Sequence, residues 1–394
     1  MGCQLRIVRY VCSMSSLSYI IWEASPDMFV FPSWLPLIGE RPVRWYGLLF
    51  ALGFLISQQV MFYIHKKEGK PEKDVETLTV YMVIATIIGA RLGHVFFYEP
   101  DKYLANPIDI LKIWEGGLAS HGAAFGILFA LWLYTRYDIN RKFQFKRIKR
   151  PHQNWLQVVD RIVIVVALTG CLIRLGNFMN SEIYGLPTHS NYGVVFAKNV
   201  NDTFLTQSSP VETLDLKNAE DREMEGGKVP VTMEIQFKDQ PEILTEQSLK
   251  RYLEGTFTTL LNRSYINGHV STTGSTLDYV LKQNPDGTFR ATVQVFGTPR
   301  HPTQLYEAST SLAIAILLFL LWNRMKIDTP DGLLFGLFLV LLFGLRFVHE
   351  LFKENQVAFE DDLTLNMGQI LSIPLILAGM FIFYRAVTLK KSKS

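Results

Sequence analysis

The chain has 394 residues, of which 48% are hydrophobic, 13% aromatic and only 19% charged. So low a share of charge favours lipid over water as the main solvent of the fold. The formal net charge of +3 is too small to indicate nucleic acid as a partner, and the basic residues cluster in short connections rather than on one face. Composition therefore favours a membrane protein and excludes a nucleic-acid-binding protein.

The first residues give little structural information. Residues 1–13 carry basic residues and then a weak apolar stretch, but no long apolar region with a small-residue cleavage site follows. We expect no cleaved signal peptide and consider Met14 as an alternative start. Cys3, Cys12 and Cys171 are odd in number and lack metal-ligand spacing, so the sequence predicts neither a disulfide framework nor a zinc site.

Seven apolar runs have the length and composition of membrane spans, for which about 20 mainly apolar residues are needed. The third run is short, and the fourth contains Asp160, Arg161 and Arg174, so the ends of both are uncertain. The seven predicted spans are 45–64, 78–97, 120–134, 156–178, 304–322, 332–351 and 367–384.

The basic residues of the short connections predict the orientation of these spans. Four segments that fall on one side of the membrane hold seventeen Lys or Arg, whereas the short loops of the other side hold three, Lys102, Lys112 and Lys353. Because basic residues near span ends stay on the cytoplasmic side, we expect an external N-terminus and a cytoplasmic C-terminus.

The long connection after the fourth span is polar and is expected to lie outside. Residues 201–300 hold ten Lys or Arg against fourteen Asp or Glu. Apolar residues alternate with polar ones near 231–237 and 289–295, which predicts two strands with one buried face each. Between them a helical spacing recurs, carried by Leu249, Tyr252, Leu253, Phe257, Leu260 and Leu261.

The predicted fold class is an all-α integral membrane protein with seven transmembrane helices and a small α+β extracytoplasmic insert. The expected organisation is an N-terminal extracytoplasmic segment at 1–44, four spans and the start of a head region at 45–200, the insert at 201–300, and three spans with a cytoplasmic tail at 301–394. The insert contains no motif that indicates chemistry, so it is either a docking module for a partner or a passive elaboration of an exposed loop.

Ionisable residues inside spans are costly in lipid and are therefore functional candidates. Topology places most of them near the outer ends of their spans, where a phospholipid headgroup lies. This group consists of Arg91, His94, His121, Arg174, Asn177, Asn180, Glu182, His301, Gln304, Tyr306, Glu307, Arg346, His349 and Glu350.

The residue types in this group suit an anionic lipid headgroup. Arginine presents a planar fork of donors to phosphate oxygens and stays charged. Histidine has an ordinary pKa near 6.5 and so can take a proton from an incoming nucleophile. Glycines in SHGAAFG and RLGNFMNSEIYG permit close backbone approach.

Structural roles remain open for many of these residues. Arg91 either contacts substrate or serves as a structural or snorkelling residue. Arg174 and Arg346 either bind ligand or pair with Glu182 and Glu350, and the four-residue spacing favours an Arg346–Glu350 pair within one helix. His94 and His349 are either functional or serve in packing and hydrogen bonding. Trp45 and Tyr46 either contact substrate or belong to an interfacial aromatic belt.

The segment RLGNFMNSEIYG at 174–185 closely resembles the signature of the prolipoprotein diacylglyceryl transferase family. The other blocks stand in the family's order and touch every predicted span: RWYGLLFALGF at 44–54, GARLGHVFFY at 89–98, GGLASHGAAFG at 116–126, HPTQLYE at 301–307, GLRFVHELFKE at 344–354 and MGQILSIPLILAG at 367–379.

The resemblance implies a seven-span enzyme of the bacterial cytoplasmic membrane. Its expected reaction transfers the sn-1,2-diacylglyceryl group of phosphatidylglycerol to the lipobox cysteine of a prolipoprotein and releases glycerol 1-phosphate, with no metal or organic cofactor. His121 is the family's candidate base, and Arg174 and Arg346 are the two catalytic arginines. The expected substrate-binding residues are Arg174, Asn177, Glu182, Gly185, Tyr46, Tyr306, Glu307, Glu350 and Arg91.

Some positions depart from the family pattern. SHGAAFG has alanine where the family commonly has another glycine, and Leu342 occupies a position that is often tyrosine. The insert enlarges the external head, which leaves the docking of the lipoprotein open.

Two other functional classes stay as alternatives. A lipid or solute transporter also places arginine and histidine inside spans, but the inner halves of most spans here are apolar. A membrane scaffold would use the insert to bind a partner, and deletion of the insert would separate it from an enzyme.

Overall fold

The computed structural model describes residues 19–34, 39–113, 116–139, 145–219, 222–240, 242–272, 274, 276–354 and 364–391. Met14, Cys3 and Cys12 lie outside the described residues. The chain forms two compact units. We call the first the sheet unit (1–46, 177–305 and 352–354) and the second the helix unit (47–176, 306–351 and 355–394).

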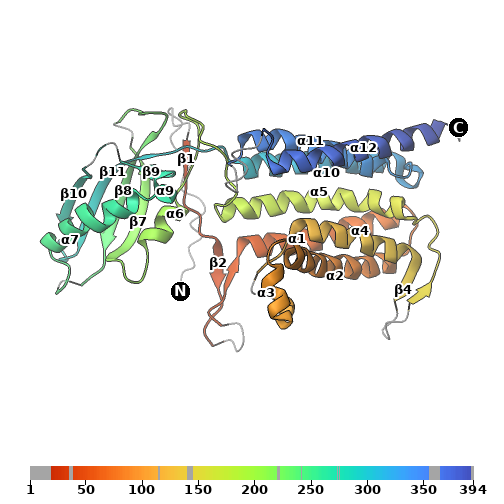
Figure 1. Cartoon of the computed structure of the whole chain (residues 1–394), viewed down its shortest axis with the longest axis horizontal. Helices are drawn as coiled ribbons and strands as arrows, with labels where there is room; N and C mark the ends of the chain where they lie inside the picture. The colour runs from red at the N-terminus through yellow and green to blue at the C-terminus, as the bar shows by residue number, and fades with distance from the viewer. Residues whose placement is uncertain are drawn as a thin grey trace. The chain divides into compact units, whose positions relative to one another are not determined.

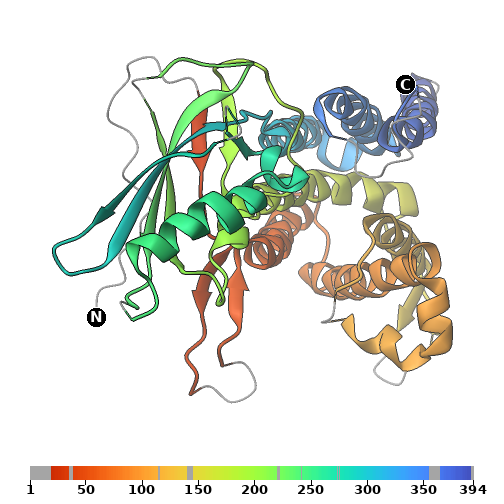
Figure 2. The same cartoon turned by 60° about the vertical axis from the view of Figure 1, so that its left-hand side comes forward.

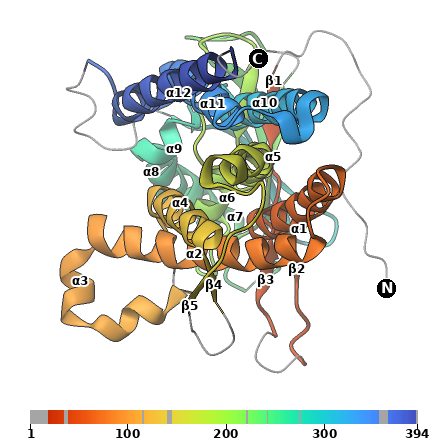
Figure 3. The ribbon, with the colours of Figure 1, turned by 90° about the vertical axis from the view of Figure 1, so that its right-hand side faces the viewer.

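The helix unit consists of long apolar helices (Figures 1 and 3). Its long helices are α1 (Trp45–Lys67), α2 (Glu72–Phe97), α4 (Ser120–Arg136), α5 (Trp155–Met179), α10 (Thr303–Met325), α11 (Leu333–His349) and α12 (Met367–Lys391). Its short elements are α3 (Pro100–Ala105), η1 (Pro107–Leu111), β4 (Tyr137–Ile139), β5 (Phe145–Arg147), η4 (Lys326–Asp328) and η5 (Glu350–Phe352). Residues 45–46 of α1, 177–179 of α5, 303–305 of α10 and Phe352 of η5 belong to the sheet unit.

Six of the seven predicted spans are long and apolar enough to cross a membrane, within the residues that the structure describes. They are Trp45–Lys67, Glu72–Phe97, Trp155–Met179, Thr303–Asp328, Leu333–Phe352 and Met367–Thr388. The predicted span at 120–134 is a helix, α4, but it has 17 residues. At a rise of about 1.5 Å per residue it reaches about 25 Å, short of a hydrocarbon layer about 30 Å thick. The third of the seven predicted spans is therefore not confirmed.

Glycines let α2 and α4 pack at close range, as the end view of Figure 3 shows. A Cβ atom at Gly89 would lie 2.5 Å from the carbonyl oxygen of Gly122, and one at Gly126 would lie 2.7 Å from the carbonyl oxygen of Ala85. Without a hydrophobic driving force between helices in lipid, such close backbone approach supplies the packing contacts. The glycine of SHGAAFG that follows His121 is thus required by the helix contact.

The charged residues of the fourth span are neutralised inside the helix unit. Asp160 accepts hydrogen bonds from the backbone N–H of Gly332 (2.7 Å) and Phe335 (2.8 Å), so it caps the N-terminus of α11. Arg161 pairs with Glu68 at 2.9 Å, and Trp322 donates to the same carboxylate at 2.7 Å. These buried charges hold helix ends together, since each has an opposite charge or dipole.

The sheet unit contains a five-stranded antiparallel sheet with the order β10-β11-β8-β7, in which β9 also pairs with β11 (Figure 2). The strands are β7 (Val211–Asn218), β8 (Val229–Phe237), β9 (Val270–Ser271), β10 (Asp278–Gln283) and β11 (Phe289–Gly297). The two strands predicted from alternation are β8 and β11, which are neighbours with Met233 opposite Val293. That prediction is confirmed.

The predicted helix between these strands is also confirmed, with a local change of winding. It comprises α7 (Glu246–Tyr252), a π-helical turn η3 (Leu253–Phe257) and α8 (Thr258–Leu261). Leu249, Leu253, Phe257 and Leu261 follow every fourth residue and are all fully buried in the core of the sheet unit. A strict α-helix would rotate such a series off the sheet, and the wider π turn compensates for that rotation.

Shorter elements complete the sheet unit. They are β1 (Tyr19–Trp22), β2 (Asp27–Val30), β3 (Pro42–Arg44), β6 (Gly193–Phe196), α6 (Lys198–Phe204) and α9 (Ser264–Asn267). β1 pairs in parallel with β6, and β2 pairs with β3. Tyr19 donates to the carbonyl oxygen of Pro230 at 2.8 Å. The N-terminal segment is thus part of the same core as the residues after α5.

Candidate active site

The segment RLGNFMNSEIYG begins in the last turns of α5 and continues as a loop beyond Met179. In this loop Ser181 (φ 53°) and Ile183 (φ 57°) adopt a left-handed backbone conformation. This conformation is uncommon for residues other than glycine and is strained for a β-branched residue such as isoleucine. Contacts from elsewhere in the sheet unit must therefore hold the loop.

Glu182 lies at the centre of those contacts. Its carboxylate accepts hydrogen bonds from the side-chain amides of Asn177 (2.7 Å) and Asn180 (3.3 Å). Its backbone carbonyl accepts one from Gln304 at 2.6 Å. The structure thus brings together Asn177 and Glu182, both predicted as substrate-binding residues.

The block HPTQLYE fixes the rest of the loop. Thr303 donates from its hydroxyl to the carbonyl of Ile183 at 2.9 Å. The backbone N–H of Gly185 donates to the carbonyl of His301 at 2.9 Å, and the N–H of Leu186 donates to the carbonyl of Phe352 at 2.8 Å. Two sequence blocks more than a hundred residues apart therefore form one hydrogen-bonded unit.

Gly185 has no room for a side chain. A Cβ atom there would lie 2.5 Å from the carbonyl oxygen of Phe352, 2.7 Å from Thr303 Cγ2 and 2.8 Å from His301 Cβ. Real Cβ atoms do not approach this closely. The predicted importance of Gly185 thus has a steric basis in the sheet unit.

Arg300 is a positioning residue that the sequence did not indicate. Its side chain is buried and donates to the carbonyl oxygens of Gly185 (3.1 Å) and Gly268 (3.0 Å). It also pairs with Glu354 at 3.1 Å and lies over the ring of Tyr184 at 4.9 Å. Its position directly before HPTQLYE was the only available signal.

In the helix unit each of the two predicted arginines meets a carboxylate through its Nε. Arg174 lies 2.5 Å from Glu307, and Arg346 lies 3.6 Å from Glu350. The arginine side chains remain 25% and 44% exposed, respectively. The expected Arg346–Glu350 pair is confirmed, and the carboxylate partner found for Arg174 is Glu307, which the sequence placed in another block.

The carboxylate of Glu350 lies against the first turn of α12. Asn366 lies within 3.4 Å of one carboxylate oxygen. A Cβ atom at Gly368 would lie 2.6 Å from Glu350 Cδ and 2.7 Å from Oε1. Gly368 therefore leaves the space in which Glu350 reaches Arg346.

We expect Gly368→Ala to lower activity without unfolding the protein. The group displaced is the end of a flexible side chain rather than backbone, so Glu350 can rotate away and release Arg346. We expect about a tenfold loss of turnover, as for other lost charge-assisted contacts, with an unchanged melting temperature. In a double-mutant cycle with Glu350→Gln the second change should add little. Full additivity of the two losses would contradict this role of Gly368.

Arg91 is enclosed by backbone carbonyls in the helix unit. Its Nε donates to Ile110 (2.9 Å), and its two Nη atoms donate to the carbonyls of Asp109, Lys112, Gly116 and Gly117. All five N–H donors of the guanidinium thus have partners. The expected substrate contact of Arg91 stays a prediction, and these contacts favour the structural alternative, in which Arg91 holds the connection between α2 and α4.

The histidines of this region lie among aromatic rings. His121 begins α4 and is half-buried, with its ring 5.2 Å from that of Phe97 and 5.8 Å from that of Tyr98. His94 stacks on Tyr98 at 5.4 Å and lies 3.3 Å from Glu99. His349 is buried at the end of α11.

The two tyrosines of the predicted site lie in the first turns of their helices. Tyr46 lies at the start of α1 and Tyr306 at the start of α10, and both are half-buried. The convergence of His121, Arg174 and Arg346 on one ligand stays a prediction.

A further residue that the sequence did not indicate, His269, supports the loop through Tyr184 and Asn199. His269 is buried, and its Nε2 lies 3.0 Å from the hydroxyl of Tyr184 and 2.9 Å from the side-chain amide of Asn199. Burial, together with the nearby Arg300 charge, lowers the pKa of His269 to about 4. The ring is therefore neutral at physiological pH and accepts these hydrogen bonds through Nε2.

The depressed pKa of His269 predicts a loss of stability in mild acid. The pKa rises from about 4 in the folded protein to 6.5 when the ring is free, so unfolding takes up a proton below pH 6.5. The contribution of the neutral His269 ring to the free energy of unfolding is complete above pH 6.5. This contribution falls by about 3 kcal/mol at most as the pH decreases toward 4. We expect His269→Gln to flatten this part of a melting-temperature profile from pH 7.5 to 4. An unchanged acid slope in this variant would show that other groups carry it.

Comparison with known proteins gives a consistent family assignment. Residues 32–385 match the model of the family described as prolipoprotein diacylglyceryl transferase. Proteins named phosphatidylglycerol--prolipoprotein diacylglyceryl transferase are similar over nearly their whole length. That of Tolumonas auensis is 35% identical over 92% of this chain and 95% of its own, and those of Chloroherpeton thalassium and Porphyromonas gingivalis are each 33% identical over 95% and 97%. The chain therefore belongs to the prolipoprotein diacylglyceryl transferase family and is a transferase.

Proposed function

We propose that this protein transfers the diacylglyceryl group of phosphatidylglycerol to the thiol of a lipobox cysteine in a prolipoprotein. The names of its relatives supply the two substrates. The observation that carries the proposal is the pair of carboxylate-oriented arginines, Arg174 with Glu307 and Arg346 with Glu350. A carboxylate at Nε fixes the plane of a guanidinium, and a fixed guanidinium presents its donors to a phosphodiester in a defined direction.

The reaction is a substitution at the carbon of the diacylglyceryl group that is bonded to the phosphate oxygen. The cysteine thiolate attacks this carbon and forms a C–S bond, while the C–O bond to phosphate breaks. The bonding pair leaves with the phosphate oxygen, so the products are a thioether and glycerol 1-phosphate. Arg174 and Arg346 stabilise the negative charge that develops on the departing phosphate, which lipid would solvate poorly.

His121 takes the proton of the thiol in this scheme. Its half-buried ring at the first turn of α4 lies 5.2 Å from the ring of Phe97 and 5.8 Å from that of Tyr98. A neutral imidazole can act as a general base, directly or through one water molecule.

The membrane placement completes the proposal. α4 serves as the third of seven spans, and the residues that flank it complete the crossing. The N-terminus and the 201–300 insert lie outside the bacterial cytoplasmic membrane, and the C-terminus lies inside, as the distribution of basic residues predicts. The exposed large apolar side chains of the long helices fit contact with lipid.

One assay tests the function. The purified full-length protein is incubated with phosphatidylglycerol and a lipobox peptide, and mass spectrometry follows the peptide. We expect a diacylglyceryl adduct on cysteine, release of glycerol phosphate in equal amount, and no adduct when the peptide's cysteine is replaced by serine. Absence of the adduct with folded protein would refute the proposal.

A further inference from the structure

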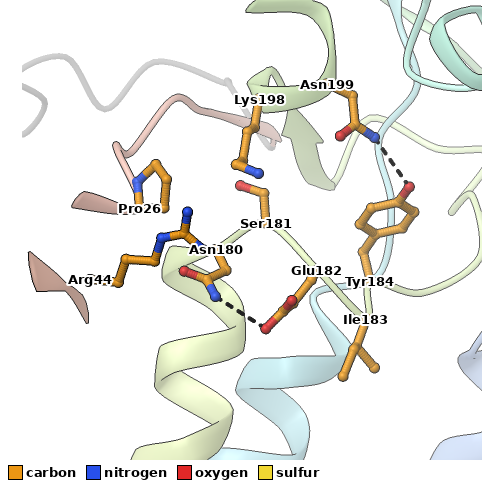
Figure 4. Close-up of a pocket in the computed structure, with 9 residues that line it drawn as sticks. All are labelled: Pro26, Arg44, Asn180, Ser181, Glu182, Ile183, Tyr184, Lys198 and Asn199. Carbon is orange, nitrogen blue, oxygen red and sulfur yellow. Dashed lines mark hydrogen bonds between the residues drawn. The ribbon is translucent and has the colours of Figure 1, made fainter. Parts of the chain in front are cut away.

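A polar cavity of about 420 Å³ lies in the sheet unit, beside the loop 180–185 that follows α5. Figure 4 shows its nine lining residues, which come from the N-terminal segment, the loop after α5 and the start of α6. They are Pro26, Arg44, Asn180, Ser181, Glu182, Ile183, Tyr184, Lys198 and Asn199. Only Pro26 and Ile183 are apolar, so the cavity suits a polar group and not acyl chains.

Two cations approach the cavity from different elements. Arg44 ends β3 and Lys198 begins α6, and in Figure 4 both side chains point toward the loop. The ion pairs that they form are long, 3.6 Å from Arg44 to Asp27 and 3.3 Å from Lys198 to Asp202. Weakly paired cations at the rim of a polar cavity favour an anion there.

Two buried oxygen atoms of the lining have no hydrogen-bond partner among the described residues. They are Ser181 Oγ and Asn180 Oδ1. Ser181 is only 5% exposed, and Figure 4 shows its hydroxyl pointing toward the ammonium group of Lys198. An unsatisfied buried polar atom costs free energy, and Ser181 also has a strained backbone. Both costs are explained if a ligand hydrogen-bonds to this loop.

The unpartnered atoms and the charges together specify the ligand. The amide oxygen of Asn180 is an acceptor that lacks a donor. The carboxylate of Glu182 accepts from Asn177 and Asn180 through one oxygen and has capacity for a further donor. The charges of Arg44 and Lys198 favour an anion. A phosphate that carries neighbouring hydroxyl groups supplies both, and the volume lies within the range of small-molecule sites, about 300–1,000 Å³.

We infer that this cavity binds a phosphorylated polyol, with the phosphate at Arg44 and Lys198 and the hydroxyls at Asn180 and Glu182. The inference rests on the proposed function, which supplies a ligand of this chemistry, the phosphoglycerol group. The group reaches the cavity either as the headgroup of intact lipid or as the free glycerol phosphate that leaves after transfer. Arg44, the first residue of the block RWYGLLFALGF, and Lys198, which lies in none of the family blocks, thereby become ligand-binding residues.

Direct binding of a free ligand tests the cavity without turnover. Isothermal titration of the full-length protein in detergent compares sn-glycerol 1-phosphate, inorganic phosphate and glycerol. We expect glycerol 1-phosphate to bind more tightly than either fragment. Arg44→Gln and Lys198→Gln should each weaken it about tenfold, since each removes a charge-assisted hydrogen bond. Ser181→Ala should weaken it less.

Lys282→Gln is the matched control, because Lys282 is an exposed residue of β10 and lines no part of the cavity. It should leave binding unchanged. Equal affinity in the wild type and in the Arg44→Gln/Lys198→Gln double variant would overturn the inference, as would failure of glycerol 1-phosphate to bind better than inorganic phosphate.

Transfer kinetics then distinguish the two sources of the ligand. If the cavity receives the free product, Lys198→Gln should relieve inhibition by added glycerol 1-phosphate and leave the KM for phosphatidylglycerol unchanged. If it receives the lipid headgroup, that KM should rise. A wild type that binds glycerol 1-phosphate but transfers nothing would refute the proposed function alone, and one that transfers normally without cavity binding would refute this inference alone.

Discussion

Arg174→Ala is expected to reduce diacylglyceryl transfer by about 10²–10³-fold, the usual cost of removing one preorganised group that stabilises transition-state charge. The substitution also leaves the buried carboxylate of Glu307 without its cation at 2.5 Å. Arg174→Lys should recover little of the loss, because an ammonium group keeps the charge but lacks the planar fork. The peptide-adduct assay measures both variants.

One control and one companion variant make the Arg174 result specific. Arg324→Ala removes an arginine side chain from an exposed position near the C-terminal end of α10 and should retain full activity. Arg346→Lys tests the second arginine and should also abolish transfer while the protein still inserts. Normal turnover by Arg174→Ala in protein with a native melting temperature would remove Arg174 from the mechanism.

Gly185→Ala should inactivate the protein almost as completely, although it removes no functional group. The added Cβ meets the backbone oxygen of Phe352 at 2.5 Å, and this oxygen already accepts the N–H of Leu186. Relief of the clash must move the loop, and a displacement of about 1 Å at a site can cost about 10²-fold in rate. Overpacking of this kind also costs about 1–3 kcal/mol of stability.

A second glycine serves as the control for Gly185. Gly344 lies within α11, and a Cβ there meets nothing within 4 Å. Gly344→Ala should keep activity and gain up to about 1 kcal/mol, since alanine favours helix over glycine. Retention of full activity by Gly185→Ala would show that the loop tolerates displacement and that its position does not limit the reaction.

The location of the site was partly visible in the sequence. The segment after α5, the HPTQLYE block and the two helix-end arginines were all identified, and Glu350 was correctly expected four residues after Arg346. The partner of Arg174 was not, because Glu182 is nearer in sequence whereas Glu307 is the residue that the structure places at Arg174. Proximity in sequence predicts contacts within one helix and gives no information on contacts between helices.

Arg300 and His269 were missed for a related reason. Both act through backbone carbonyls or neighbouring side chains of the loop, and neither belongs to a recognisable motif. Their roles depend on burial and on the identity of the atoms that surround them. The lining of the cavity, which joins Arg44 to Lys198 across more than 150 residues of sequence, was invisible for the same reason.

The sequence by itself determined the apolar helices, the two central strands with their intervening helix, and the family blocks. These features follow from local periodicity and composition, since burial of an apolar face is repeated at every turn or every second residue. Only the tertiary structure decided that α4 is 17 residues long, that Glu307 orients Arg174, and that Ser181 and Ile183 adopt positive φ angles. Such choices depend on hydrogen bonds and close contacts between distant segments, whose free energy compensates the local strain.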